Sequence, residues 1–389
     1  MEEVLTRGVA NIIPGKSELF GKLTSKKKLN IYLGIDPTST KIHLGHGVLL
    51  RKLNTLAKKG HNVTFLIGDF TALIGDNSDK DSERPALTTK EIEENFKTYK
   101  KQAEKLLDFS LVKIRYNSEW LKKLTFEDIL KLTGHFSVGD FVGRELVRKR
   151  LNENKRVGLH ELLYPVMQGY DSYMLKTDLQ IGGTDQTFNM QAGRALIKDL
   201  DNRESFVLTA QILEGANGQK MSKSLGNAIW LDDNAVDVYR KVMAVPDEYI
   251  LNYFLLATNL SVDKISDYEK RLKKENPINI KKELAFEITT ELHNEKSAQE
   301  AQEEFEKTVQ GKELSEKIEL LSINASDSLT ALDILINSKI VSSRSEAKRL
   351  IEQRGITIDG KEITNANFDF KDGQILRIGK RKIFKIKTK

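Results

Sequence analysis

A chain of 389 residues is longer than one ordinary hydrophobic core can accommodate, and its length predicts roughly two or three domains. Hydrophobic residues make up 39% and charged residues 30% of the chain, as in globular proteins, and no apolar run approaches the roughly 18 residues of a membrane helix. The mixed N-terminus does not resemble a signal peptide, and the absence of cysteine excludes disulfides and thiolate metal sites. We therefore expect a soluble, cytoplasmic protein with no membrane partner.

The net charge of +6 is concentrated near the C-terminus. Residues 328–389 contain 14 basic and 7 acidic side chains, whereas the preceding 327 residues contain 48 basic and 49 acidic side chains. A small basic module joined to a neutral body is typical of proteins that bind a phosphate backbone. The same pattern also fits a basic, solvated end that binds nothing.

Residues 1–230 alternate β-rich runs with helical patterns. Residues 30–35 predict a strand, 44–59 a helix that ends at Gly60, and 62–67 a second strand. A crossover of this length makes the two strands parallel. The alternation continues with helices at 90–107, 161–175 and 186–197 and strands at 112–116, 178–181 and 205–208. We expect an α/β domain with a doubly wound, Rossmann-like parallel sheet, and ligands beyond the carboxyl ends of its strands.

The remaining residues predict two further domains. An all-helical domain at 231–325 has helices at 234–243, 248–258, 261–273, 278–294 and 297–309, followed by a polar linker at 310–327. A small α+β domain at 326–389 has short helices at 331–337 and 343–352 and several short strands. On its own, the helical domain fits a role in stability or dimerisation.

A histidine pair, His43-Leu44-Gly45-His46, directly follows the first predicted strand. The two imidazoles share one face at a positive helix N-terminus, which suits a polyphosphate. Gly45 leaves room for a flat adenine against the backbone. Two histidines with no function on a helix surface would show the same sequence pattern. Simpler nucleotidyltransferases also use a His-x-Gly-His arrangement. We expect no metal site, because only His61, His135, His160 and His293 remain as further imidazoles.

A second motif, Lys220-Met221-Ser222-Lys223-Ser224, lies among glycines 215, 218 and 226. Two ammonium groups flanked by hydroxyls can neutralise a triphosphate, although a solvated basic loop has the same composition. Both motifs in this order resemble the HIGH and KMSKS signatures of class I aminoacyl-tRNA synthetases.

The region between the two motifs narrows the resemblance. Tyr164, Gln168 and Asp171 have the spacing of one helix face, and a Leu-Gln-Ile-Gly-Gly-Thr-Asp-Gln segment follows at 179–186. Both features resemble the tyrosyl-tRNA synthetase family, and the resemblance extends over nearly the whole chain. The related tryptophan enzymes lack the Tyr-x-x-x-Gln-x-x-Asp arrangement.

The resemblance implies a role for each matching residue. Tyr32 and Asp171 would bind the tyrosine phenol, and Asp76, Tyr164 and Gln168 its ammonium group. Gln186 would lie near the carboxylate, and Thr71 and Asn117 would also bind the tyrosine. Asn117 and Trp120 would support the pocket. Gly34, Asp36, Gly45, Gly183 and Asp185 would position ATP, whose Mg²⁺ arrives with the nucleotide. His43, His46, Lys220 and Lys223 would act on the phosphates, and Lys80 and Arg84 on pyrophosphate. At two positions this chain has Asn77 and Asp79 where the family usually has Pro and Gly. This difference weakens the match at Lys80, whereas Asp76 itself matches the family.

The same resemblance implies the reaction and the partners. Tyrosine and ATP would form tyrosyl-adenylate and pyrophosphate, and the tyrosyl group would pass to tRNA(Tyr), with a homodimer as the working form. The helical domain at 231–325 resembles the anticodon-binding region of class I enzymes. The tail resembles an S4-like RNA-binding domain, in which positive side chains would face phosphates: Arg344, Lys348, Lys361, Lys380, Arg381 and Lys382.

The sequence is also compatible with two other functions. A paralogue kept only for RNA binding would share the fold but would have lost part of His43, His46, Lys220 and Lys223. A tryptophan-specific enzyme would share the signatures but activate a different amino acid.

Overall fold

The structure, a computed structural model, describes residues 1–75, 87–215, 218–219, 221, 226–309, 319–323, 345, 349–351, 355–363, 371–378 and 382–388. The chain forms two compact units, Met1–Gln302 and Glu303–Lys389, which we describe separately. None of the described helices is long and apolar enough to cross a membrane.

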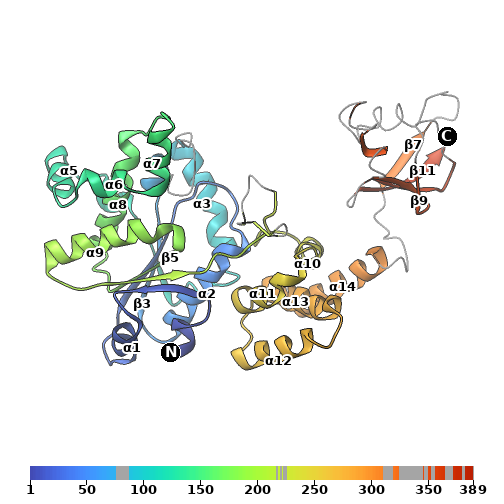
Figure 1. Ribbon diagram of the computed structural model, residues 1–389, viewed down its shortest axis with the longest axis horizontal. Helices are drawn as coiled ribbons and strands as arrows, with labels where there is room; N and C mark the ends of the chain where they lie inside the picture. The colour runs from blue at the N-terminus through green and yellow to red at the C-terminus, as the bar shows by residue number, and fades with distance from the viewer. Residues whose placement is uncertain are drawn as a thin grey trace. The chain divides into compact units, whose positions relative to one another are not determined.

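The first unit is built on a six-stranded sheet in the order β1-β6-β5-β2-β3-β4 (Figure 1). Its strands are β1 (Val9–Ile13), β2 (Asn30–Ile35), β3 (Asn62–Ile67), β4 (Val112–Tyr116), β5 (Leu179–Gly183) and β6 (Phe206–Ala210). The predicted Rossmann-like α/β class is confirmed, and β2 to β6 are parallel. The edge strand β1, which pairs antiparallel with β6, was not predicted. Its mixed burial lacks the alternation that marks a strand.

Helices flank this sheet, and all but α1, which was not predicted, lie close to their predicted positions. They are α1 (Lys16–Thr24), α2 (Leu44–Lys58), α3 (Thr89–Ala103), α8 (Leu159–Met174) and α9 (Thr187–Asp201). Helix α3 begins at a capping box, in which the Thr88 hydroxyl and the Glu91 carboxylate each bind the other's backbone N–H. Helices α8 and α9 lie side by side (Figure 1), and Gly169 permits this approach because a Cβ there would meet Ala192 backbone at 3.2 Å.

Short helices between β4 and α8 were missed by the sequence analysis. They are α4 (Ser118–Leu121), α5 (Phe126–Thr133), α6 (Val138–Val142) and α7 (Glu145–Asn152). Each is too short to show a clear helical period in a sequence window. Single 3₁₀ turns complete the unit at η1 (Glu2–Leu5), η2 (Thr71–Leu73), η3 (Thr184–Gln186) and η4 (Asp247–Tyr249).

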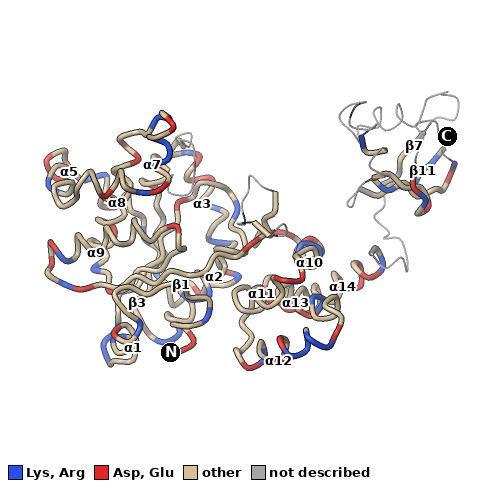
Figure 2. Tube along the Cα trace, in the orientation of Figure 1, with Lys and Arg blue, Asp and Glu red and all other residues tan. Residues whose placement is uncertain are grey.

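The predicted helical region packs against the sheet region through α2. Its helices are α10 (Ala235–Met243), α11 (Ile250–Ala257), α12 (Val262–Leu272), α13 (Pro277–Leu292) and α14 (Glu295–Val309). Acidic and basic residues alternate along α12 (Figure 2), as expected for an exposed helix. A partly buried ion pair joins Arg51 of α2 to Glu291 of α13. The Arg7 side chain donates to the carbonyls of Leu255 and Thr258 at the end of α11.

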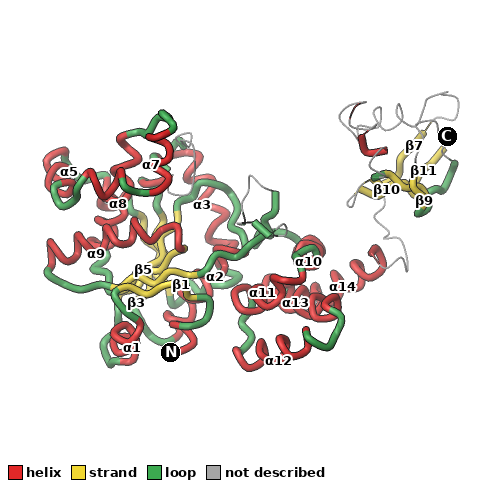
Figure 3. Tube along the Cα trace, viewed as in Figure 1, coloured by secondary structure: helices red, strands yellow, loops and turns green. Residues whose placement is uncertain are grey.

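The second unit contains a five-stranded sheet in the order β7-β11-β10-β8-β9 (Figure 3). Its strands are β7 (Glu319–Ile323), β8 (Ile356–Ile358), β9 (Lys361–Glu362), β10 (Ile375–Ile378) and β11 (Lys382–Thr388). The predicted linker at 310–327 is therefore wrong in part, because β7 pairs parallel with β11. A five-residue strand among polar neighbours gives too weak a signal to detect. The predicted helix at 331–337 lies outside the described residues, and Ser345 and 349–351 are helical.

Candidate active site

The sheet order places β2 beside β5, and the chain continues from them toward opposite edges. Side chains just after parallel strands gather at such a switch point. Asp36 follows β2, Asn117 follows β4, and Asp185 follows β5. The structure thus brings Asp36, Asn117 and Asp185 of the predicted site to one edge of the sheet.

Asp171 of α8 is held at one end of this edge by two donors. Trp120 Nε1 donates to its Oδ1 at 2.7 Å, and Asn117 Nδ2 donates to its Oδ2 at 3.1 Å. Burial raises the pKa of the Asp171 carboxyl to about 8, the two donors oppose the shift, and Asp36 and Asp69 add to it. A buried carboxylate with spare lone pairs can accept one further hydrogen bond from a ligand hydroxyl.

The Tyr32 hydroxyl lies in the same buried region but does not bond to Asp171 in the structure. It shares a hydrogen bond with Ser172 Oγ at 2.8 Å and donates to Gln180 Oε1 at 3.3 Å. Burial, and then the charge of Asp171, raise the pKa of Tyr32, so it stays a neutral donor. Sequence analysis missed Ser172 and Gln180. Gly193 belongs with them, because a Cβ there would stand 2.4 Å from Ser172 Oγ.

Asp36 accepts two hydroxyl donors from opposite sides. Thr71 Oγ1 donates to Oδ1 at 2.8 Å, and Tyr164 Oη donates to Oδ2 at 2.9 Å. Asn117 also donates to Thr71 Oγ1 at 2.9 Å, so one amide connects the surroundings of both carboxylates. Gly68 makes the Asp36 contact possible, since a Cβ there would lie 1.9 Å from Asp36 Oδ1. This role of Gly68 was not predicted.

The histidine pair lies at the start of α2. His43 is the residue before the first turn, and its ring centroid is 3.8 Å from that of His46. A Cβ at Gly45 would stand 2.9 Å from His43 Nδ1, so the glycine leaves space for the imidazole. Gln102, which was not predicted as a site residue, binds the chain just before this helix. Its Oε1 accepts from Ile42 N at 2.7 Å, and its Nε2 donates to Thr40 O at 2.8 Å.

Comparison with known proteins matches this arrangement to one family. The profile of class I tRNA synthetases (W and Y) matches residues 24–310, and the S4 domain profile matches residues 332–376. The tyrosine–tRNA ligase of Thermotoga maritima is 40% identical over 389 residues, covering 99% of this chain and 96% of that protein. The chain belongs to the tyrosyl-tRNA synthetase family. Its activity is that of a class I tyrosine–tRNA ligase that uses ATP.

Other similar proteins are also tyrosyl-tRNA synthetases. A tyrosine–tRNA ligase 2 of Clostridium acetobutylicum is 39% identical over 392 residues, covering 99% of this chain and 97% of that protein. The solved structure of the Archaeoglobus fulgidus tyrosyl-tRNA synthetase complexed with L-tyrosine is 25% identical with a TM-score of 0.61, covering 77% of this chain and 98% of that one.

Several residues assigned by resemblance to the synthetase family lie outside the described structure. They are Asp76, Lys80, Arg84, Lys220, Lys223, Arg344, Lys348, Lys380 and Arg381. Lys382 begins β11, and Lys361 is exposed on β9. Gln168 and Gly34 lie on α8 and β2 as expected, and Gln186 Oε1 accepts from Asn189 Nδ2 at 3.0 Å. A Cβ at Gly183 would meet Asp185 Oδ1 at 2.4 Å, so this glycine leaves room for the Asp185 carboxylate.

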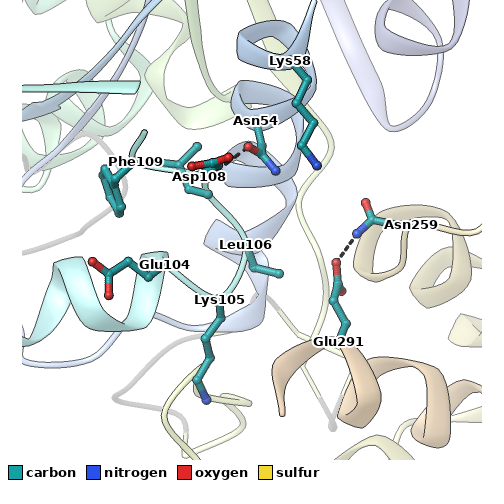
Figure 4. A pocket seen from close by; sticks show the side chains of 10 residues that line it. Asn54, Lys58, Glu104, Lys105, Leu106, Asp108, Phe109, Asn259 and Glu291 are labelled. Carbon is teal, nitrogen blue, oxygen red and sulfur yellow. Dashed lines mark hydrogen bonds between the residues drawn. The ribbon is translucent and has the colours of Figure 1, made fainter. Parts of the chain in front are cut away.

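A separate cavity of about 480 Å³ lies away from the synthetase site, where the ends of α2 and α3 face the helical region (Figure 4). Lys58, Lys105, Asp108 and Glu291 are among its lining residues. Figure 4 shows the Asn259 amide bonded to the Glu291 carboxylate, which already pairs with Arg51. The lining charges of both signs are therefore largely used by the protein itself.

Proposed function

We propose that the site at the carboxyl ends of the parallel strands activates L-tyrosine with Mg²⁺-ATP. The phenol of tyrosine binds at one end of this site, and the phosphates of ATP bind at the other. The phenol lies between Tyr32 and Asp171, and the ammonium group lies near Asp76, Tyr164 and Gln168. The phosphates lie at the start of α2, against His43 and His46. The observation that carries this proposal is Asp171, a buried carboxylate held by Trp120 and Asn117 at the base of the site.

The activation step follows from this placement. A tyrosine carboxylate oxygen bonds to the α-phosphorus, and the bond to the β-phosphate oxygen breaks, so pyrophosphate leaves with the electron pair. Negative charge grows on the phosphates, and imidazole N–H donors at a helix N-terminus stabilise it. Lys220 and Lys223 add positive charge there, Lys80 and Arg84 assist pyrophosphate, and Asp36, Gly183 and Asp185 position the adenosine. Mg²⁺ arrives with the nucleotide.

In the second step, a terminal ribose hydroxyl of tRNA(Tyr) attacks the acyl carbon of tyrosyl-adenylate, and AMP leaves. The C-terminal unit supplies a basic surface for this RNA. Strand alternation buries Leu376, Ile378 and Ile386 on one face of its sheet. Arg377 and Lys385 project to the opposite, exposed face. A basic sheet face fits a structured RNA that is recognised through its backbone.

The working form is a homodimer of the cytoplasm. Support comes from large apolar side chains that stand exposed on the missed helices and at the start of α8. Phe126 is 75%, Leu130 57%, Val138 72% and Leu159 76% exposed. Apolar side chains gathered on a surface mark an interface, and two-fold dimers are the commonest homo-oligomers. Phe126→Asp should give a monomer by light scattering, and an unchanged mass would remove these helices from the interface.

Amino-acid-dependent ATP–pyrophosphate exchange across the twenty amino acids tests the substrate assignment. Tyrosine alone should support exchange, and phenylalanine should fail because it leaves Asp171 without its hydroxyl donor. Exchange with tryptophan but not with tyrosine would refute the proposal. Removal of residues 328–389 should leave exchange intact and weaken aminoacylation at limiting tRNA, whereas unchanged aminoacylation would exclude the C-terminal unit from tRNA binding.

A further inference from the structure

The start of α2 is held by a neighbouring segment as well as by its own strand. Leu44 N donates to Ile229 O at 2.7 Å, and Leu231 N donates to Ile42 O at 2.8 Å. These bonds form a short antiparallel bridge between His43 and Trp230, whose rings lie 6.0 Å apart. The position of His43 therefore depends on where residues 229–231 are fixed.

The C-terminal side of this segment is fixed by the helical region. His293, just after α13, bonds through Nε2 to Asp233 O at 2.9 Å. Lys241 of α10 pairs with the Asp233 carboxylate, which also accepts from Trp230 N at 2.9 Å. Lys105, which belongs to the sheet region, donates a hydrogen bond from Nζ to Leu231 O at 2.6 Å.

The helical region also fixes the chain before this segment. Tyr253 of α11 is fully buried, and its hydroxyl donates to Glu214 O at 2.6 Å. Asn252 Nδ2 donates to the Glu214 carboxylate at 2.8 Å. Residues 214 and 233 are thus each bonded to the same group of helices, and the chain between them carries the strand pairing with His43.

We propose that Tyr253 and His293 are positioning residues for tyrosine activation. By fixing Glu214 and Asp233, they set the position of Trp230 and, through the backbone bridge, that of His43 and the start of α2. The inference rests on the proposed role of His43 at the phosphates. Small displacements of a charge-stabilising donor lower the rate of the chemical step, because preorganised geometry is what such donors contribute.

Tyr253→Phe removes one hydroxyl and keeps the buried ring. It should lower kcat for tyrosine-dependent pyrophosphate exchange roughly 5–20-fold, with the KM for tyrosine unchanged, because misplaced donors act on the transition state. His293→Ala should have a similar effect, and His293→Gln should restore activity because an amide nitrogen can replace Nε2 as the donor. Tyr268→Phe is the matched control: Tyr268 stacks on Phe254 in the same helical region. It should change neither constant.

The deciding measurement is a double-mutant cycle with His43→Ala. If Tyr253 acts through His43, Tyr253→Phe should have little further effect in the His43→Ala background. The same rate loss in both backgrounds, or a loss with Tyr268→Phe as large as with Tyr253→Phe, would overturn the inference. Normal exchange in His43→Ala alone would instead refute the proposed role of His43 and leave the inference without its basis.

Discussion

The two ends of the site are built in different ways. At the phenol end, Asp171 is buried and held by the side chains of Trp120 and Asn117. At the phosphate end, His43 is held mainly through backbone pairing with residues 229–231. The donors to Asp171 both come from the sheet region, whereas the chain segment that pairs with His43 is also bonded to the helical region.

This difference has a chemical logic. The phenol keeps the same hydroxyl throughout the reaction, so its contacts contribute equally to ground and transition states. Charge on the phosphates changes during the reaction, so donors at the start of α2 contribute most in the transition state. Changes at the first end should affect affinity for tyrosine, and changes at the second should affect the rate.

The largest effect is expected at the phosphate end. His46→Ala should slow adenylate formation by roughly 10²–10³-fold, the loss usual for one preorganised donor to developing charge. Rapid-quench measurement of adenylate formation checks this. The dissociation constant of tyrosine should stay within about twofold, and a large rise with normal chemistry would assign His46 to the wrong end of the site.

Asp171→Asn should have the next largest effect. Losing the acceptor of a buried hydrogen bond costs about 1–3 kcal/mol, which corresponds to roughly a 5–150-fold loss in kcat/KM for tyrosine. Steady-state pyrophosphate exchange measures it, with Asp69→Asn as a control carboxylate that accepts from Ser118 nearby. If Asp171→Asn kept both activity and selectivity, the phenol would bind elsewhere.

Tyr32→Phe should have a smaller effect. One hydrogen bond to a neutral group contributes about 0.5–1.5 kcal/mol, so discrimination between tyrosine and phenylalanine should fall roughly 2–10-fold. The ratio of the two kcat/KM values measures it. Unchanged discrimination would mean that the Tyr32 hydroxyl serves only Ser172 and Gln180.

The last effect concerns stability and leaves the reaction aside. The unfolded chain releases the Asp171 proton near its ordinary pKa of 3.8, whereas the folded chain holds it to about pH 8. Between these values the folded state binds more protons, so the free energy of unfolding falls as pH rises, by at most about 1.4 kcal/mol per pH unit from this group. Urea unfolding between pH 5 and 8 should show a flatter dependence for Asp171→Asn. Parallel curves would contradict the buried environment of this carboxyl.

The sequence predicted the elements that carry long, regular patterns. The strands at 30–35 and 62–67 and the helix at 44–59 agree with β2, β3 and α2 to within a residue. The face of α8 that carries Tyr164 and Asp171 was also predicted, because the two positions share a helical period. Short helices, the antiparallel edge strand and β7 were missed, since elements of a few residues give no clear period.

Parts of the site could not be predicted because they depend on tertiary contacts. Ser172 lies next to a predicted residue in sequence, yet its bond to Tyr32 exists only because β2 passes beside α8. Gly68 gives a local signal of a turn, but its role comes from its closeness to Asp36, far away in sequence. The pairing of Trp230 with His43 likewise has no sequence pattern.

Single-turnover adenylate formation at increasing tyrosine tests the central claim most directly, with His46→Ala and Asp171→Asn compared side by side. Saturating tyrosine should return Asp171→Asn to near the normal rate, because the lost bond acts equally in both states, and should leave His46→Ala slow. If excess tyrosine rescued His46→Ala, or failed to rescue Asp171→Asn, the division of the site into a recognition end and a reaction end would be wrong.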